Sequence, residues 1–196
     1  MKFLREWMLC LLVLPLFMSC VTVTTRPENT PQARAVPENT VAVRQSVLNE
    51  GEKYIDTPYG SPPNVPVTFD CSGFINYTFT NAVKMPLATS TKAYLTIGRE
   101  IDFKDAKPGD LLVFASQPGG SNPDHVAILY KKSETGELRG SWLLHAISIP
   151  IQSAAIKGDP YKDGVKIGEL GKRGDGVWQN EYFLARYMTT RRVIEE

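Results

Sequence analysis

Three side chains of this sequence have the types that acyl-transfer chemistry uses: one cysteine and the chain's two histidines. Cys71 follows Asp70 in the segment DCSG, and His125 and His145 lie in short apolar segments further along. If Asp70 caps a helix that begins at Cys71, the N–H groups of the first turn and the helix dipole favour a thiolate. The two residues after Cys71 are small, so a substrate could approach the sulfur. Cys71 is therefore a candidate nucleophile.

The two histidines are the candidates for activating that thiol. Both lie in predicted strands, and their midpoint is residue 135, within the polar segment KKSETGELRG that favours a hairpin turn. Folding the strands about this point places His125 and His145 side by side or offset by about one residue, and such neighbours have Cβ atoms roughly 5 Å apart. One imidazole could then take the thiol proton while the second orients the first.

Two other interpretations of these residues stay open on this pattern alone. Cys71 could be a buried thiol that acts as a small apolar side chain, and each histidine could be a satisfied core residue. The three side chains could also bind zinc, with water as a fourth ligand. Because no C-x-x-C or H-x-x-x-H spacing supports such a site, we expect no metal and no cofactor.

The elements that must position these side chains are helices first and strands afterwards. Three helices are expected: residues 41–56 with Thr40 as the cap, residues 70–83, and a short one from Thr89 or Ser90 to Gly98. Strands are expected at DLLVFA (110–115), HVAILY (125–130), SWLLHAIS (141–148) and EYFLARYM (181–188). Residues 157–176, with six glycines and many charges, predict a long loop or hairpin insertion. This order predicts an α+β domain with a small antiparallel sheet.

The first twenty residues have the pattern of an export signal. Lys2 and Arg5 precede 12 apolar residues, Trp7 to Met18, which are too few to cross about 30 Å of hydrocarbon as a helix. Cys20 follows Ser19 as the lipidated cysteine follows a small residue in a bacterial lipobox. We expect a signal peptide at 1–19, a lipidated Cys20 with a flexible tether over 20–39, and the functional domain at 40–196. The protein would be exported and anchored to a bacterial membrane, on the periplasmic side of the outer membrane where two membranes exist.

Charge and cysteine content limit the kinds of partner that we expect and the state of the cysteines. Lys and Arg total 22 against 21 acidic residues, a formal net charge of +1. No basic excess is available to release counterions from nucleic acid, so we expect no nucleic-acid partner. The 196 residues suit one domain with short appendages. If Cys10 leaves with the signal and Cys20 carries lipid, Cys71 is an unpaired thiol in an exported protein, where thiols are usually paired.

Four segments of the chain resemble the NlpC-type peptidases, papain-like enzymes of bacterial cell walls. In order, they are DCSGF (70–74), KPGDLLVF (107–114), DHVAILY (124–130) and LLHA (143–146), and the resemblance covers roughly residues 45–192. It implies that Cys71 attacks an amide carbonyl, that His125 is general base and later acid, and that His145 orients His125. Tyr59 matches a family Tyr thought to position the nucleophile or the oxyanion. The Cys71 N–H is a natural oxyanion donor.

The substrate that this resemblance implies is the peptide stem of peptidoglycan. The family typically hydrolyses the amide bond between D-glutamate and the following diamino acid, through a thioester acyl-enzyme. The expected partners are therefore stem peptides and, through the N-terminal lipid, a membrane, with the protein acting as a monomer.

The chain departs from the family pattern near the expected substrate groove. Gly60-Ser61 replaces a longer aromatic-Gly-Gly segment, Leu87-Ala88 stands where an Arg is common, and Ala127 stands where Gly is frequent. Two alternative functions stay open: a non-catalytic wall-binding or assembly lipoprotein on the same fold, and an amidase or acyltransferase that acts on another substrate.

Overall fold

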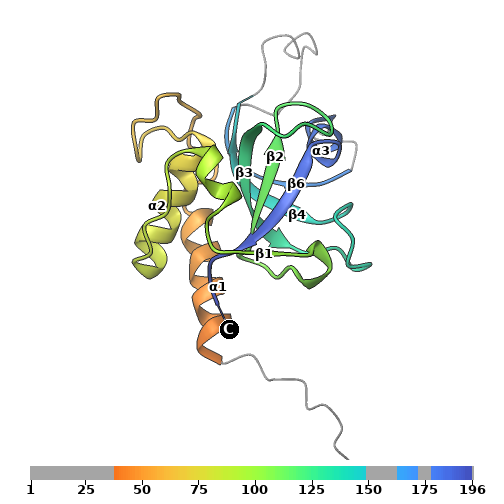
Figure 1. Ribbon diagram of the computed structural model, residues 1–196. Helices are drawn as coiled ribbons and strands as arrows, with labels where there is room; N and C mark the ends of the chain where they lie inside the picture. Colours follow the sequence, from red (N-terminus) through yellow and green to blue (C-terminus); the bar gives the residue numbers. More distant parts are fainter. Residues whose placement is uncertain (1–37, 149–162, 172–177, 196) are drawn as a thin grey trace, which may run out of the picture. The chain divides into compact units, whose positions relative to one another are not determined.

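A six-stranded antiparallel sheet is the frame of the fold (Figure 1). The computed structural model describes residues 38–148, 163–171 and 178–195, all within the unit Ala35–Glu196. The strands are β1 (Arg99–Ile101), β2 (Leu111–Ala115), β3 (Pro123–Lys131), β4 (Trp142–Ile147), β5 (Gly164–Glu169) and β6 (Tyr187–Arg192). Their order in the sheet is β1-β6-β2-β3-β4-β5. The predicted signal peptide, the lipidation site Cys20 and nearly all of the tether lie outside the described residues.

Helices cover both faces of this sheet. They are α1 (Glu38–Glu52), α2 (Cys71–Val83), α3 (Trp178–Leu184) and two short 3-10 helices, η1 (Thr91–Leu95) and η2 (Phe103–Asp105). α1 and α2 lie side by side on one face of the sheet, and α3 lies apart from them (Figure 1). One core joins α1 and α2 to residues such as Val126 and Ile128, and a second joins Phe183 of α3 to Ala127 and Leu129. The predicted α+β fold with an antiparallel sheet is confirmed.

The helix that begins at Cys71 is formed as predicted. Its buried side chains include Cys71, Phe74, Ile75, Thr78 and Phe79, a spacing of i, i+3, i+4, i+7 and i+8 that makes one continuous apolar stripe. The helix ends where the C-cap residue takes a left-handed conformation, with φ of 58°. α2 therefore packs from Cys71 to Phe79 and presents its first residue at a fixed place.

Most other predicted elements are found, with shifted ends. η1 lies where the third helix was expected, and β2, β3 and β4 form from the three apolar segments predicted as strands. The first helix begins at Glu38, so Thr40 lies inside its first turn and is not the cap, and it ends at Glu52 instead of residue 56. Thr40 is buried, which gives the residue a packing role there.

The strand predicted over residues 181–188 is wrong. That segment completes α3, and β6 begins only at Tyr187. An aromatic, apolar run is compatible with either helix or strand, and here Phe183 buries its ring from a helix. β6 escaped prediction because its buried side chains are polar or charged: Thr190, Arg191 and Arg192.

Part of the predicted insertion at 157–176 is a strand of the sheet. β5 pairs along β4, with Leu144 opposite Ile167. Its outer edge also bonds the segment before the second helix, since the Asp56 N–H donates to the Val165 carbonyl and the Val165 N–H donates to the Thr57 carbonyl, each at 2.9 Å. The described part of this insertion therefore anchors the segment that leads to Tyr59.

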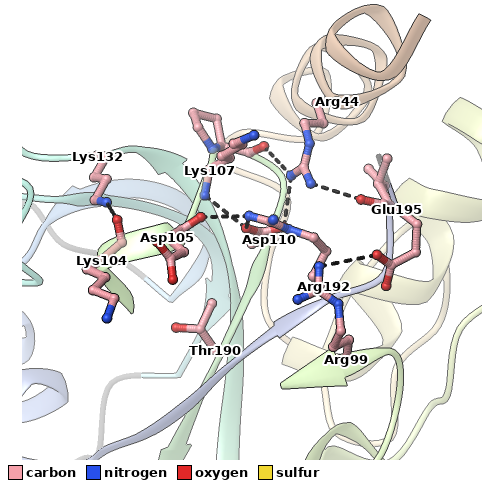
Figure 2. Close-up of polar contacts among 12 residues, drawn as sticks. Arg44, Arg99, Lys104, Asp105, Lys107, Asp110, Lys132, Thr190, Arg192 and Glu195 are labelled. Atoms are coloured by element: carbon pink, nitrogen blue, oxygen red, sulfur yellow. Dashed lines mark hydrogen bonds and ion pairs between the residues drawn. The ribbon is translucent and has the colours of Figure 1, made fainter. Parts of the chain in front are cut away.

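A buried carboxylate, Asp110, joins the helical layer to the sheet (Figure 2). Arg44 of α1 donates from Nη1 to Asp110 Oδ1 and Arg192 of β6 donates from Nη2 to Oδ2, each at 2.8 Å. The Lys107 N–H donates to Oδ2 at 2.9 Å, and Asp110 has no exposed surface. Arg44 also donates to the Ile194 carbonyl at 2.9 Å. Three segments distant in sequence thus meet at one buried charge.

Replacing Asp110 by its neutral isostere should destabilise the fold strongly. Asp110→Asn leaves Arg44 and Arg192 buried without their counter-charge, and removing one partner of a buried ion pair costs about 3–5 kcal/mol. Urea unfolding measures this loss. The matched control is Glu195→Gln, which breaks the exposed Arg99–Glu195 pair (3.4 Å) and should cost less than about 1 kcal/mol. Equal losses in the two variants would show that the buried charge is not what joins the layers.

Candidate active site

Cys71 is the first residue of α2, and a capped turn holds it there. Asp70 Oδ1 accepts a hydrogen bond from the Gly73 N–H at 2.6 Å, and a Cβ on Gly73 would lie 2.8 Å from that oxygen. The small residue therefore serves the cap, whereas the sequence suggested that it serves substrate access. The Ser72 hydroxyl donates to the Thr89 carbonyl at 3.0 Å, which ties the segment after α2 to this turn.

The Cys71 thiol lies against the start of β3. Its Sγ is 3.5 Å from Thr91 Oγ1 and 4.0 Å from the Asp124 carbonyl oxygen, and 6% of the residue is exposed. Asp124 directly precedes His125. α2 thus brings the predicted nucleophile to the backbone of the strand that carries the predicted base.

The pKa of the Cys71 thiol lies above its ordinary value. Burial is the largest cause, and the Asp70 carboxylate acts in the same direction. Hydrogen bonds that the Thr91 hydroxyl and the N–H groups of Val126 and Ser72 can give to the thiolate lower the pKa but do not outweigh burial. The resting thiol is therefore protonated at neutral pH, and a base has to remove its proton before it can attack.

The two histidines lie on one face of the sheet and share a hydrogen bond. His125 Nε2 and His145 Nδ1 are 2.9 Å apart. β3 and β4 pair Ile128 with Leu144, and this register continued places His145 opposite Ala127, two residues from His125. The hairpin centre is therefore residue 136, one later than predicted. An offset of two residues keeps both rings on the same face.

Aromatic packing surrounds both imidazoles and keeps them neutral. The ring of Phe183 stacks on His125 at 4.6 Å between centroids and lies 5.4 Å from His145. Burial lowers the pKa of His125 to about 3. Burial, with a further effect of the His125 charge, lowers the pKa of His145 well below its ordinary value. Neither ring carries a proton charge at neutral pH.

Neutral rings allow two arrangements of the shared proton. If His125 Nε2 donates, its Nδ1 holds a lone pair and can accept the thiol proton; if His145 Nδ1 donates, His125 must carry its own hydrogen on Nδ1 and cannot act as a base. His145 Nε2 is buried with no hydrogen-bond partner among the described residues. In the first arrangement this Nε2 carries a hydrogen. Only that arrangement makes His125 a competent base.

The Cys71 thiol and the His125 imidazole are not bonded to each other. Among the described residues, no hydrogen bond joins Cys71 Sγ to His125. The thiol belongs to the core on the helical side, whereas both rings contact Phe183 of the second core. Catalytic hydrogen bonds are often long in a free enzyme and tighten when substrate binds. The structure thus brings the two histidines together and places the thiol beside the strand that bears His125.

Tyr59 lies in the loop before α2, as the resemblance to the NlpC-type peptidases implies. Its backbone forms an isolated parallel β-bridge with that of Phe69. Two hydrogen bonds close the loop there, from the Gly60 N–H to the Phe69 carbonyl (3.0 Å) and from the Phe69 N–H to the Pro58 carbonyl (3.1 Å). Burial, followed by the charge of Cys71, raises the pKa of Tyr59 to about 12. Its phenol keeps its hydrogen at neutral pH and can donate it to an anion.

The zinc alternative finds no support in the described part of the chain. No group of three or more His, Cys, Asp or Glu side chains there could hold a metal ion. One ring nitrogen of each histidine, His125 Nε2 and His145 Nδ1, is engaged in the hydrogen bond between the two rings instead of pointing to a shared metal position.

Sequence reasoning missed two residues of this site, Thr91 and Phe183. Thr91 is 20 residues from Cys71 along the chain, and no motif links the two positions. Phe183 lies in the segment predicted as a strand, where its ring could not be assigned to the histidines. An assignment of residues 178–184 as a helix would have been the only available signal.

Acidification should destabilise the fold through the two buried histidines. An unfolded histidine takes up a proton near pH 6.5, whereas the pKa of folded His125 is about 3. Between these values the unfolded state binds more protons, so the free energy of unfolding falls as the pH falls below 6.5, by at most about 1.4 kcal/mol per pH unit for each histidine. Urea unfolding at pH 7 and pH 5 should show a smaller loss for His145→Gln than for the wild type. An unchanged pH slope would contradict the lowered pKa of His145.

Gly164 should be intolerant of a side chain because the Tyr59 segment passes over it. Its φ is 134°, and a Cβ there would lie 2.4 Å from the Thr57 carbonyl oxygen. Gly136 is the matched control, with φ of 77° and no backbone atom within 4 Å of its Cβ position. A positive φ costs about 1–2 kcal/mol in both alanine variants, and the close contact should add about 1–3 kcal/mol for Gly164→Ala. Urea unfolding that ranks the variants equally would show that the contact relaxes without cost.

Comparison with known proteins identifies the family of this chain. Residues 56–167, more than half of the chain, match the NlpC/P60 family. The chain is 33% identical to the gamma-DL-glutamyl hydrolase of Bacillus subtilis strain 168 over 81% of this chain and 46% of that protein, so it spans less than half of that relative. The NlpC/p60 domain of the peptidoglycan hydrolase SagA is 26% identical, with a TM-score of 0.52 over 76% of this chain and 97% of that domain. An NlpC/P60 family protein from Bacillus cereus shares the fold with a TM-score of 0.58 and 20% identity, over 78% of this chain and 40% of that one. The resemblance inferred from four short motifs is confirmed, and this chain belongs to the NlpC/P60 family.

Proposed function

We propose that this chain is a cysteine peptidase that hydrolyses an amide bond in the stem peptides of peptidoglycan, between D-glutamate and the following diamino acid. One arrangement carries the proposal. A capped helix start holds the Cys71 thiol against the residue before His125, and His125 shares a 2.9 Å hydrogen bond with His145. A thiol, a base and a group that orients the base are the parts that nucleophilic acyl transfer needs.

In the proposed reaction the first step moves the thiol proton. His125 Nδ1 takes the proton from Cys71 while His145 holds the other ring nitrogen, and the sulfur attacks the amide carbonyl. Burial disfavours both the thiolate and the imidazolium, so the two charges form together and next to each other. Their mutual attraction in a desolvated site offsets part of the cost of separating them.

The developing oxyanion requires donors that are already in place. The N–H of Cys71, at the first position of α2, has no acceptor within the helix, and the phenol of Tyr59 keeps its hydrogen at neutral pH. His125 then gives its proton to the leaving amine, which leaves a thioester on Cys71. Water that loses a proton to His125 hydrolyses this thioester and restores the thiol.

The relatives support the proposed substrate class. One is named a gamma-DL-glutamyl hydrolase, and the SagA domain belongs to a protein named a peptidoglycan hydrolase. An amide bond next to D-glutamate is consistent with both names. Because the chain covers only 46% of the first relative, the bond that it cleaves is inferred from the site and from these names together.

We further propose that the protein is exported and acts as a monomer held at a membrane by lipid on Cys20. Export and lipid anchoring are supported by the N-terminal sequence, with its basic start, its short apolar segment and the cysteine that follows. A tether over residues 20–39 would let the domain reach the wall. Among the described residues, no helix is long and apolar enough to cross a membrane.

The test incubates the full-length chain with purified peptidoglycan fragments of defined stem and identifies the products by mass spectrometry. Cys71→Ala removes the nucleophile and should abolish product formation. His125→Gln should lower the rate by about 10²–10⁴-fold, the usual contribution of a general base. His145→Gln should lower it less, because an orienting group is partly replaceable. Thermal unfolding of each variant separates lost chemistry from lost folding.

Three other outcomes would each change the proposal in a different way. Product formation by Cys71→Ala would exclude the thiol as nucleophile. No product from the wild type, together with rapid alkylation of Cys71, would favour an amidase or acyltransferase with another substrate. No product and an inert thiol would favour a wall-binding protein that has the fold without turnover.

A further inference from the structure

Among the described residues, the charge that most affects the resting Cys71 thiol is an anion, the Asp70 carboxylate. The titratable groups around the sulfur are Asp70 at the cap of α2, Tyr59 in the preceding loop and Tyr94 in η1, and β3 contributes the backbone carbonyl of Asp124. Burial raises the pKa of both tyrosines and keeps them neutral, and His125 is neutral until it takes the thiol proton. Apart from the imidazolium that forms when the proton moves, stabilisation of the thiolate must therefore come from hydrogen-bond donors.

The contacts of Sγ differ in how they respond when the proton leaves. The Asp124 carbonyl, 4.0 Å away, can only accept, so it suits the thiol and repels the thiolate. The Thr91 hydroxyl, 3.5 Å away, can accept from the thiol and, after rotation about its C–O bond, can donate to the thiolate. Of these two contacts, only the hydroxyl serves both protonation states.

Thr91 is held at this place by bonds that do not involve the thiol. The Leu87 N–H donates to Asn76 Oδ1 of α2 at 2.9 Å, and the Ser72 hydroxyl donates to the Thr89 carbonyl at 3.0 Å. η1 begins at Thr91 itself, and a β-branched side chain has few rotamers. The hydroxyl is therefore fixed relative to α2 before the nucleophile is used.

We propose that Thr91 is a positioning residue for the nucleophile, whose hydroxyl accepts from the Cys71 thiol at rest and donates to the thiolate during the reaction. When the proton moves, the S–H bond breaks, an N–H bond forms on His125 Nδ1, and the bonding electron pair stays on sulfur. The hydroxyl then turns its hydrogen toward that pair. This inference rests on the proposed function, because it requires Cys71 to be the nucleophile.

The test measures how the alkylation of Cys71 by iodoacetamide depends on pH in the full-length chain. Mass spectrometry of the tryptic fragment 54–84 isolates the signal of Cys71 from those of Cys10 and Cys20. Thr91→Val removes the hydroxyl and keeps the shape, and Thr91→Ser keeps the hydroxyl. Thr96→Val is the matched control, because its hydroxyl lies at the other end of η1 and bonds the Ala93 carbonyl at an exposed place.

Thr91→Val should lower the alkylation rate at neutral pH about ten-fold and raise the midpoint of the pH profile by about one unit, as expected when a hydrogen bond to a charged group is lost. Thr91→Ser and Thr96→Val should both follow the wild-type profile. A merely structural role of Thr91 would change stability and leave this midpoint in place. If Thr91→Val fails to fold, Thr91→Ala compared with Thr91→Ser carries the same expectation.

Two results would overturn the inference, and they differ in what else they overturn. A Thr91→Val profile that coincides with that of Thr96→Val removes the role of the hydroxyl and leaves the proposed peptidase intact. A wild-type Cys71 that stays unreactive at every pH removes both. A shifted midpoint in Thr91→Val, together with uncleaved stem peptides, supports the inference and rejects only the proposed substrate.

Discussion

The buried charge of Asp110 is the constraint on which the rest of the structure depends. Its two arginine partners lie 66 and 82 residues away along the chain, one on α1 and one on β6. The backbone of Asp110 also accepts from the Leu129 N–H of β3 at 2.8 Å. One carboxylate thus fixes α1, on which α2 packs, relative to the strand that carries His125. Charges buried this deeply are tolerated only where hydrogen bonds satisfy them, so the geometry around Asp110 has little freedom.

The candidate site needs this constraint because its two halves come from different layers. The thiol belongs to the helical side, and the imidazoles lie among the aromatic rings of the other core. A shift of α2 along the sheet would separate Cys71 from β3, and the first core opposes such a shift because α2 supplies part of it. Burial also keeps thiol and imidazole uncharged at rest, so in the proposed reaction charge is separated only when a substrate arrives. Preorganised donors then decide how much that separation costs.

The sequence allowed prediction of the features whose causes are local. Asp70 before an apolar stripe of helical spacing predicted the start of α2, and three apolar segments predicted β2, β3 and β4. The histidine pair was predicted because the midpoint of the two residues falls in a polar turn segment, and the observed offset of two residues also keeps both side chains on one face. β6 was not predictable in this way, because Arg191 and Arg192 are buried only by virtue of distant partners such as Asp110 and the Ile97 carbonyl. Thr91 and Phe183 reach the site through tertiary packing, which leaves no pattern in the nearby sequence.

The contact between β5 and the segment before Tyr59 has a consequence for solubility. β5 is the last strand in the sheet order, and the open backbone of such a strand can recruit a strand from another chain. Here the Asp56 N–H donates to the Val165 carbonyl and the Thr57 carbonyl accepts from the Val165 N–H, and Lys166 beside it forms an ion pair with Asp56. The same few bonds that orient a candidate oxyanion donor therefore shield part of the sheet from self-association. Changes at this edge would be constrained by aggregation as well as by activity.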